Sequence, residues 1–233
     1  MAAGDEPLSK LFDVIVIDLP GFGESDCPPV FYSATDYAVF LKSFLDGLQC
    51  STVNVVGISY GGEVAATFAS IFSRRLDALV LIAGTGLQKP YWPASKEIIW
   101  RSIAKTMKHV IMKSKIALSV LSRRSYFDIR HQPHNLIENF MKPLSEPAKR
   151  DVWLNTLRNA LLPDPNFSKM LTTINCTTLI LWGNDDRSLP VKYAYEFQRM
   201  IRQSHLKIIT KCGHSVPLEQ PTEVCDAIQD FVN

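Results

Sequence analysis

The sequence has no long hydrophobic run. Its longest continuous apolar stretch, Ala78 to Ala83, has the length of a strand and falls far short of the ~18 residues that a membrane-spanning helix needs. Residues 1–10 include Asp5 and Glu6 and have no apolar core, so a secretory signal peptide is not expected. The sequence therefore predicts a protein without an integral membrane segment.

Cysteine pairs and an excess of one charge are also missing. The five cysteines are widely spaced and form no CxxC pair, which favours reduced thiols in a cytoplasmic protein over a disulfide framework. They are Cys27, Cys50, Cys176, Cys212 and Cys225. A formal net charge of +2 argues against nucleic acid as the main partner. The 233 residues, 46% of them hydrophobic, exclude a disordered tail, a collagen-like repeat and a coiled coil, and predict one large domain or one domain with an insertion.

Five short runs rich in Val, Ile and Leu are present instead. Each run is almost continuously apolar, which is typical of strands buried on both faces in a parallel sheet covered by helices. Helical patterns separate most of these runs, so the sequence predicts a doubly wound, mostly parallel α/β fold with right-handed crossovers. The five predicted strands are Asp13–Leu19, Thr52–Ile58, Ala78–Ala83, Thr177–Trp182 and Leu206–Thr210.

The interval between the third and fourth predicted strands breaks this alternation. It contains helical stretches and several prolines but no convincing strand. We interpret residues 87–173 as a helical cap inserted into an α/β core that comprises residues 1–86 and 174–233.

A candidate nucleophile lies between the second predicted strand and the helix that follows it. Gly57-Ile58-Ser59-Tyr60-Gly61 is a G-x-S-x-G pattern in the strand–turn–helix context that a nucleophile elbow requires. The flanking glycines Gly57 and Gly61 are expected to let the neighbouring backbone pass a strained serine. The backbone N–H of Tyr60 is expected to donate to a developing oxyanion. The alternative is a glycine-rich turn that contains a serine by chance.

Such a serine needs a histidine to accept its proton. His109 lies in a basic helical stretch, and His205 lies next to the last predicted strand. His131 and His134 form an H-x-x-H pair without an obvious third ligand, so no metal site is expected. His214 follows the last predicted strand, at the sheet edge where ligands bind in open α/β folds. It is therefore the candidate base, and a surface-loop histidine without a role is the alternative.

The orienting acid is expected to follow another strand at the same edge. Residues 84–87, after the third predicted strand, contain no carboxylate. Asp185 and Asp186 both follow the fourth, and position alone does not choose between them. Either one could instead cap the segment that begins near Pro190.

Together these segments resemble the α/β-hydrolase superfamily. The resemblance includes Asp18-Leu19-Pro20-Gly21-Phe22-Gly23-Glu24-Ser25, the elbow around Ser59, Trp182-Gly183-Asn184-Asp185-Asp186, and Gly213-His214 with Glu219 and Pro221. It implies a serine hydrolase that cleaves an ester, thioester, lactone, amide or carbon–carbon bond of a small or medium acyl substrate. It places the acid on Asp186, beside Ser59 and His214, and implies no metal or organic cofactor. Carboxylic ester hydrolysis is the reaction we expect first.

One family feature is missing. The superfamily usually has an H-G motif after its third strand that supplies a second oxyanion donor, and no H-G dipeptide precedes Ser59. In the family's sheet order the third strand separates the strands expected at Asp13–Leu19 and Thr52–Ile58. We therefore expect either an N-terminally shortened chain or direct pairing of those two strands. Losing one such donor typically costs about 3–4 kcal/mol of transition-state stabilisation. A hydrolase-fold binding protein without catalysis is thus the alternative function.

The predicted cap has a basic stretch with neighbouring aromatic residues. Residues 96–130 contain nine Lys or Arg and two acids. A basic face could attract an acidic substrate or a membrane surface, but a solvated polar face of a helix whose other face covers the active site is the interpretation we favour. Tyr91, Trp92 and Trp100 are candidates for an acyl pocket, with packing between cap and core as the alternative.

Overall fold

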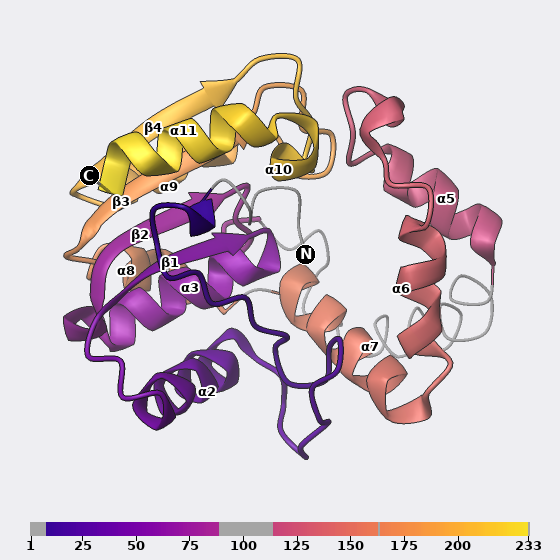
Figure 1. Cartoon of the computed structure of the whole chain (residues 1–233), viewed down its shortest axis with the longest axis horizontal. Helices are drawn as coiled ribbons and strands as arrows, with labels where there is room; N and C mark the ends of the chain where they lie inside the picture. The colour runs from indigo at the N-terminus through magenta and orange to yellow at the C-terminus, as the bar shows by residue number, and fades with distance from the viewer. Residues whose placement is uncertain (1–7, 89–113, 163, 233) are drawn as a thin grey trace.

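The computed structural model describes residues 8–88, 114–162 and 164–232. Within these residues, four parallel strands form one sheet in the order β1-β2-β3-β4 (Figure 1). The strands are β1 (Val53–Ile58), β2 (Leu76–Ile82), β3 (Thr177–Gly183) and β4 (Ser204–Ile209). Four of the five predicted strands and the predicted α/β class are therefore confirmed.

The predicted strand Asp13–Leu19 is wrong. This segment has no regular secondary structure, and Ile15 and Val16 are 51% and 68% exposed. The sheet does not close by pairing it with β1, which is an edge strand in the described part of the chain. A strand needs a partner for its backbone N–H and C=O groups. The apolar composition of the segment therefore does not suffice to make it a strand where no neighbouring strand is available.

Helices cover both faces of the sheet. One face packs against α2 (Ala34–Gly47), α3 (Tyr60–Ile71), α8 (Phe167–Leu171) and α9 (Lys192–Met200). The other face packs against α10 (Val216–Glu219) and α11 (Pro221–Val232) (Figure 1). A short 3-10 turn, Ser73–Arg75, joins α3 to β2. Neighbouring residues in β2 and β3 alternate between the two hydrophobic clusters, as expected for strands buried on both faces.

The first helix of the core shows how the sequence sets an element boundary. The Ser33 side chain accepts a hydrogen bond from the Asp36 backbone N–H, and the Asp36 side chain accepts one from the Ser33 backbone N–H. This capping box satisfies two N–H groups that the start of α2 would otherwise leave unpaired.

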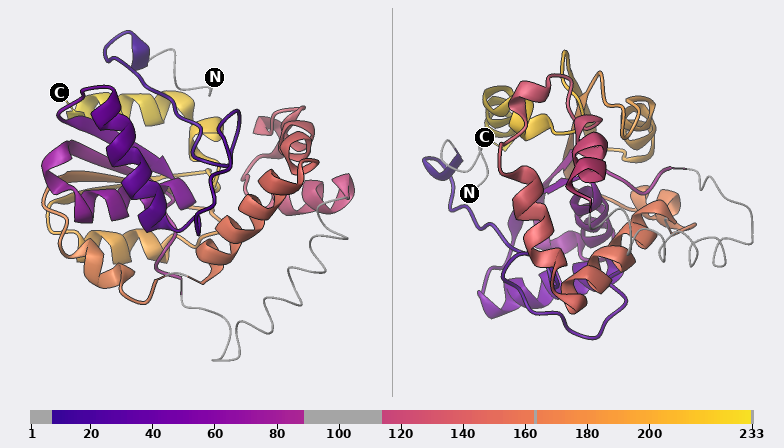
Figure 2. Two further views of the ribbon diagram at one scale, coloured as in Figure 1. Left: turned by 90° about the horizontal axis from the view of Figure 1, so that it is seen from below. Right: turned by 90° about the vertical axis from the view of Figure 1, so that its right-hand side faces the viewer.

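In the described part of the chain between β2 and β3, three further helices are present. They are α5 (Lys115–Arg123), α6 (Leu136–Leu144) and α7 (Pro147–Leu161), with a 3-10 turn at Ile129–His131, and we call them the inserted helices. Figure 2 shows them grouped at one end of the sheet. Helix α8 belongs instead to the core, because Phe167 and Leu171 pack in the main cluster. The expected cap boundaries, residues 87–173, remain a prediction. None of the described helices has the length and apolar character needed to cross a membrane.

Candidate active site

Ser59 lies at the sharp turn between β1 and α3. Its backbone has a φ of 53° and a ψ of −119°, a strained conformation for a residue other than glycine. The Ser59 N–H donates to the Ile82 carbonyl at 2.9 Å, and the Thr85 N–H donates to the Ser59 carbonyl at 3.0 Å. These bonds to β2 and the residues after it hold the strained turn in place.

The glycines around Ser59 have different roles. A Cβ atom at Gly57 would lie 2.3 Å from the Gly61 carbonyl oxygen and 2.8 Å from the Ala65 Cβ, so the turn requires glycine there. A Cβ at Gly62 would lie 2.9 Å from the Gly84 Cα. The expectation for Gly61 is wrong, because a Cβ at that position meets nothing within 4 Å. The close approach is that of the Gly61 carbonyl oxygen to Gly57, and it does not require position 61 itself to be glycine.

His214 and Asp186 complete a line of hydrogen bonds from Ser59. The His214 Nε2 lies 3.0 Å from the Ser59 Oγ, and the His214 Nδ1 lies 2.8 Å from the Asp186 Oδ2. The Asp186 carboxylate is buried, whereas the His214 side chain keeps 15% of its surface exposed. The structure thus brings these three predicted residues together from the ends of β1, β3 and β4.

The turn after β3 determines which aspartate faces His214. The Asp186 Oδ1 accepts hydrogen bonds from the N–H groups of Ser188 and Leu189, at 2.8 and 2.7 Å, so its other oxygen is directed to the histidine. Asp185 is partly exposed, and its N–H donates to the Cys212 carbonyl at 2.9 Å. The structure therefore resolves the ambiguity that position along the chain leaves open.

The Tyr60 residue that follows the nucleophile occupies the first position of α3. Its hydroxyl donates to the Tyr32 carbonyl at 3.1 Å, and burial strongly raises its pKa. The ring packs edge-on against Tyr37. These contacts hold the Tyr60 side chain against Tyr32 and Tyr37.

Glu63, one helical turn after Ser59, was not predicted from the sequence as part of the site. Its side chain is only 3% exposed, and its Oε2 accepts a hydrogen bond from the Thr85 hydroxyl at 2.6 Å. Burial raises the pKa of Glu63 to about 7. Glu63 and Asp164 also line a cavity of about 280 Å³ between α2, α3, α7 and α8. The sequence signal for this residue was that a single carboxylate stands among apolar and small residues at the start of the helix.

The remaining predicted positions form no further site in the described chain. No group of three or more His, Cys, Asp or Glu side chains that could hold a metal ion occurs among residues 8–88, 114–162 and 164–232. The predicted pocket residues Tyr91, Trp92 and Trp100 lie outside the described residues, as does much of the basic stretch. Their assignment remains a prediction.

A parallel sheet covered by helices, with a serine at a strained strand-to-helix turn, defines the α/β-hydrolase class of fold. The chain belongs to the alpha/beta hydrolase fold family, whose model matches residues 4–221. The predicted resemblance is therefore confirmed.

One protein sequence and two solved structures show what this chain is similar to. The chain is 29% identical to 2-hydroxy-6-oxononadienedioate/2-hydroxy-6-oxononatrienedioate hydrolase 1 of Pseudomonas putida, over 97% of this chain and 80% of that protein. A thermophilic esterase from Thermogutta terrifontis with malate bound superposes with a TM-score of 0.80 at 29% identity, over 99% of this chain and 83% of the esterase. A meta-cleavage product hydrolase from Pseudomonas fluorescens superposes with a TM-score of 0.79 over 98% of this chain and 82% of its own; at 21% identity this likeness concerns the fold alone.

Proposed function

We propose that the protein is a serine hydrolase in which Ser59 is the nucleophile, His214 the general base and Asp186 the orienting acid. The observation that carries this proposal is the unbroken line of hydrogen bonds from the Ser59 Oγ through both ring nitrogens of His214 to the buried Asp186 carboxylate. Such an arrangement activates a weakly acidic hydroxyl without a metal or an organic cofactor.

The proposed reaction has two half-reactions. The Ser59 Oγ attacks the substrate carbonyl carbon while His214 Nε2 accepts the hydroxyl proton, and Asp186 stabilises the imidazolium that forms. The Tyr60 N–H, at the start of α3, donates to the carbonyl oxygen as it becomes negative. His214 then gives the proton to the leaving group, which departs and leaves an acyl-enzyme. A water molecule, activated by His214, attacks the acyl group and regenerates Ser59.

The substrate class we propose is a small or medium carboxylic ester or a related acyl compound, with carboxylic ester hydrolysis first. The esterase likeness supports this chemistry. The name of the Pseudomonas putida relative favours a second candidate, hydrolytic cleavage of a carbon–carbon bond next to a ketone. Both reactions begin with attack of the serine on a carbonyl carbon, but an ester releases an alkoxide that His214 protonates on oxygen, whereas carbon–carbon cleavage releases a carbanion that must be stabilised and protonated on carbon. Tyr91, Trp92 and Trp100 are proposed to line the acyl pocket.

The proposed setting is the cytoplasm. The five cysteines all lie within the described residues and form no disulfide there, which supports a reducing compartment. A binding protein without turnover remains the alternative function.

Covalent labelling tests the proposed nucleophile. A fluorophosphonate probe is expected to label the wild-type protein and to fail on Ser59→Ala, whereas the exposed-helix control Ser43→Ala keeps full labelling. Absence of labelling in folded wild-type protein would contradict the proposal. Turnover of p-nitrophenyl esters and of a 2-hydroxy-6-oxo-2,4-dienoate then separates the two reactions, and labelling without turnover of either favours the binding protein.

A further inference from the structure

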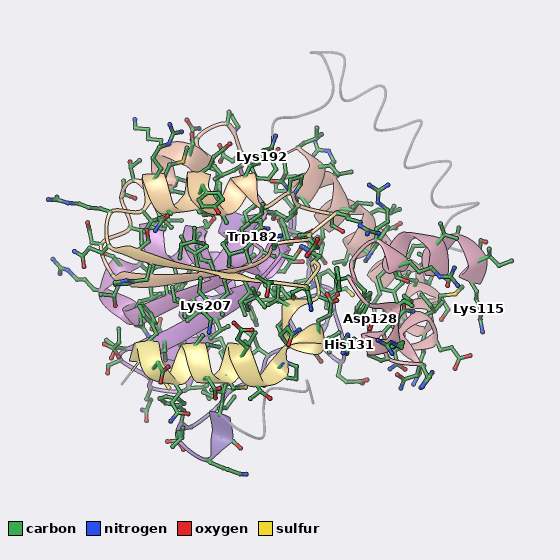
Figure 3. All side chains as sticks on the ribbon, turned by 90° about the horizontal axis from the view of Figure 1, so that it is seen from above. Lys115, Asp128, His131, Trp182, Lys192 and Lys207 are labelled. Atoms are coloured by element: carbon green, nitrogen blue, oxygen red, sulfur yellow. The ribbon has the colours of Figure 1, made fainter. Side chains whose placement is uncertain are left out.

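Besides Asp186 and Glu63, a third buried carboxylate, that of Glu219, lies next to the loop that carries His214. Glu219 is the last residue of α10, and its side chain is only 3% exposed. Its Oε1 accepts a hydrogen bond from the Gly213 N–H at 2.8 Å. Its Oε2 accepts two more, from the N–H groups of Phe127 at 2.7 Å and Asp128 at 3.1 Å. One carboxylate thus joins the backbone next to His214 to a segment between α5 and α6, and Asp128 lies beside α10 (Figure 3).

Direct backbone contacts reinforce this junction. The Ser215 N–H donates to the Ser125 carbonyl at 2.9 Å. A Cβ atom at Gly213 would lie 2.8 Å from both the Phe127 nitrogen and the Ser125 oxygen, so only glycine allows the two backbones to approach this closely. The residues on both sides of His214 are therefore attached to segment 125–128, which we call the latch segment.

We propose, on the basis of the proposed function above, that Glu219 is a positioning residue that fixes the His214 loop by binding the latch segment. The three N–H donors use both oxygens of the Glu219 side chain, so both oxygens must accept. Hydrogen bonds to a charged acceptor are also stronger than those to a neutral one. A glutamine has one accepting oxygen and an NH₂ group that would face an N–H donor. Glu219→Gln therefore breaks the junction on at least one side while it keeps the size of the side chain.

The geometry gives the consequence for catalysis. His214 must keep Nε2 near the Ser59 Oγ and Nδ1 near Asp186 at the same time, and a displacement of about 1 Å can cost about a hundredfold in rate. A loosened loop weakens the contact with Asp186, so less of the stabilisation of the imidazolium remains. His214 is consequently less effective as the base that accepts the Ser59 proton.

The test compares wild-type protein, Glu219→Gln and the matched control Glu223→Gln, whose carboxylate is half-exposed and pairs with Lys207 at the surface. The fluorophosphonate labelling rate of Glu219→Gln is expected to fall at least tenfold. Amide hydrogen exchange is expected to accelerate together at Gly213 and at Phe127–Asp128. Glu223→Gln is expected to match wild type in both measurements.

Two results would overturn the proposal. One is a labelling rate of Glu219→Gln that equals that of wild type once it is corrected for the folded fraction. The other is faster exchange on only one side of the junction. If Glu219→Gln does not fold, Glu219→Asp, which keeps the charge but is one methylene shorter, is judged by the same measurements. If wild-type Ser59 is not labelled, the proposed function fails, while hydrogen exchange still decides whether Glu219 couples the two segments.

Discussion

Replacing Glu63 with glutamine is expected to stabilise the folded protein in a manner that depends on pH. Glu63 is buried, and its hydrogen bond from Thr85 does not offset the loss of hydration, so burial raises its pKa from 4.5 to about 7. Glutamine has nearly the same shape, can accept the same hydrogen bond through its amide oxygen and carries no charge. The substitution therefore removes the cost of ionising a buried carboxyl group.

The sign and size of the effect follow from proton linkage. Between pH 4.5 and about 7 the unfolded chain has released the Glu63 proton while the folded protein still holds it. Relative to that of Glu63→Gln, the free energy of unfolding of wild type is therefore highest below pH 4.5. It falls as the pH rises through the pKa that Glu63 has in the folded protein. The difference reaches about 3 kcal/mol in favour of the variant above pH 8.

Urea unfolding followed by circular dichroism measures this difference across the range from about pH 4 to about pH 9. Glu24→Gln, at an exposed position, is the matched control and is expected to show no such trend. Thr85→Val removes the hydrogen bond that lowers the Glu63 pKa, so the loss of stability is expected to extend to higher pH in that variant. A difference between wild type and Glu63→Gln that stays constant with pH would refute the reasoning.

Two further pairs of substitutions test the turn and the acid. Gly57→Ala is expected to destabilise the fold by about 2–4 kcal/mol, because its Cβ would overlap the Gly61 carbonyl oxygen, whereas Gly61→Ala is tolerated; thermal unfolding of both variants checks this contrast, and equal losses would contradict it. Asp186→Asn is expected to lower kcat by about three to four orders of magnitude, because the amide oxygen stays with the Ser188 and Leu189 N–H groups and the NH₂ group then faces His214 Nδ1 and favours the wrong tautomer; Asp185→Asn stays within severalfold of wild type. Similar ester turnover in the two aspartate variants would reject Asp186 as the orienting acid.

Much of the site could be predicted because its signals are local. The apolar runs of β2 and β3 are buried on both faces and need no knowledge of distant residues to be recognised. Ser59 is predicted from five consecutive residues around it. The choice between Asp185 and Asp186 needs the turn itself, since two backbone N–H groups take one oxygen of Asp186 and leave the other for His214.

Contacts between distant segments could not be predicted in the same way. Glu219 and Phe127 are 92 residues apart, and nothing near Phe127 marks it as a donor to a buried carboxylate. Glu63 looks like an ordinary acidic residue in the first turn of a helix until Thr85 and the packing of α3 are known. The error at Asp13–Leu19 has the same cause, because strand formation depends on a neighbour that composition does not reveal.

The exposed edge of β1 bears on whether Ser59 can be held in place. Ser59 directly follows this edge strand, and Val56 and Ile58 are 49% and 41% exposed. The bonds that fix the serine backbone nevertheless come from the opposite side, through Ile82 and Thr85. Asp186 and His214 follow β3 and β4, further from the open edge. The geometry of the proposed triad therefore depends on the pairing of β1 with β2 and not on a further strand beyond β1, whereas a second oxyanion donor is what the family's third strand would supply.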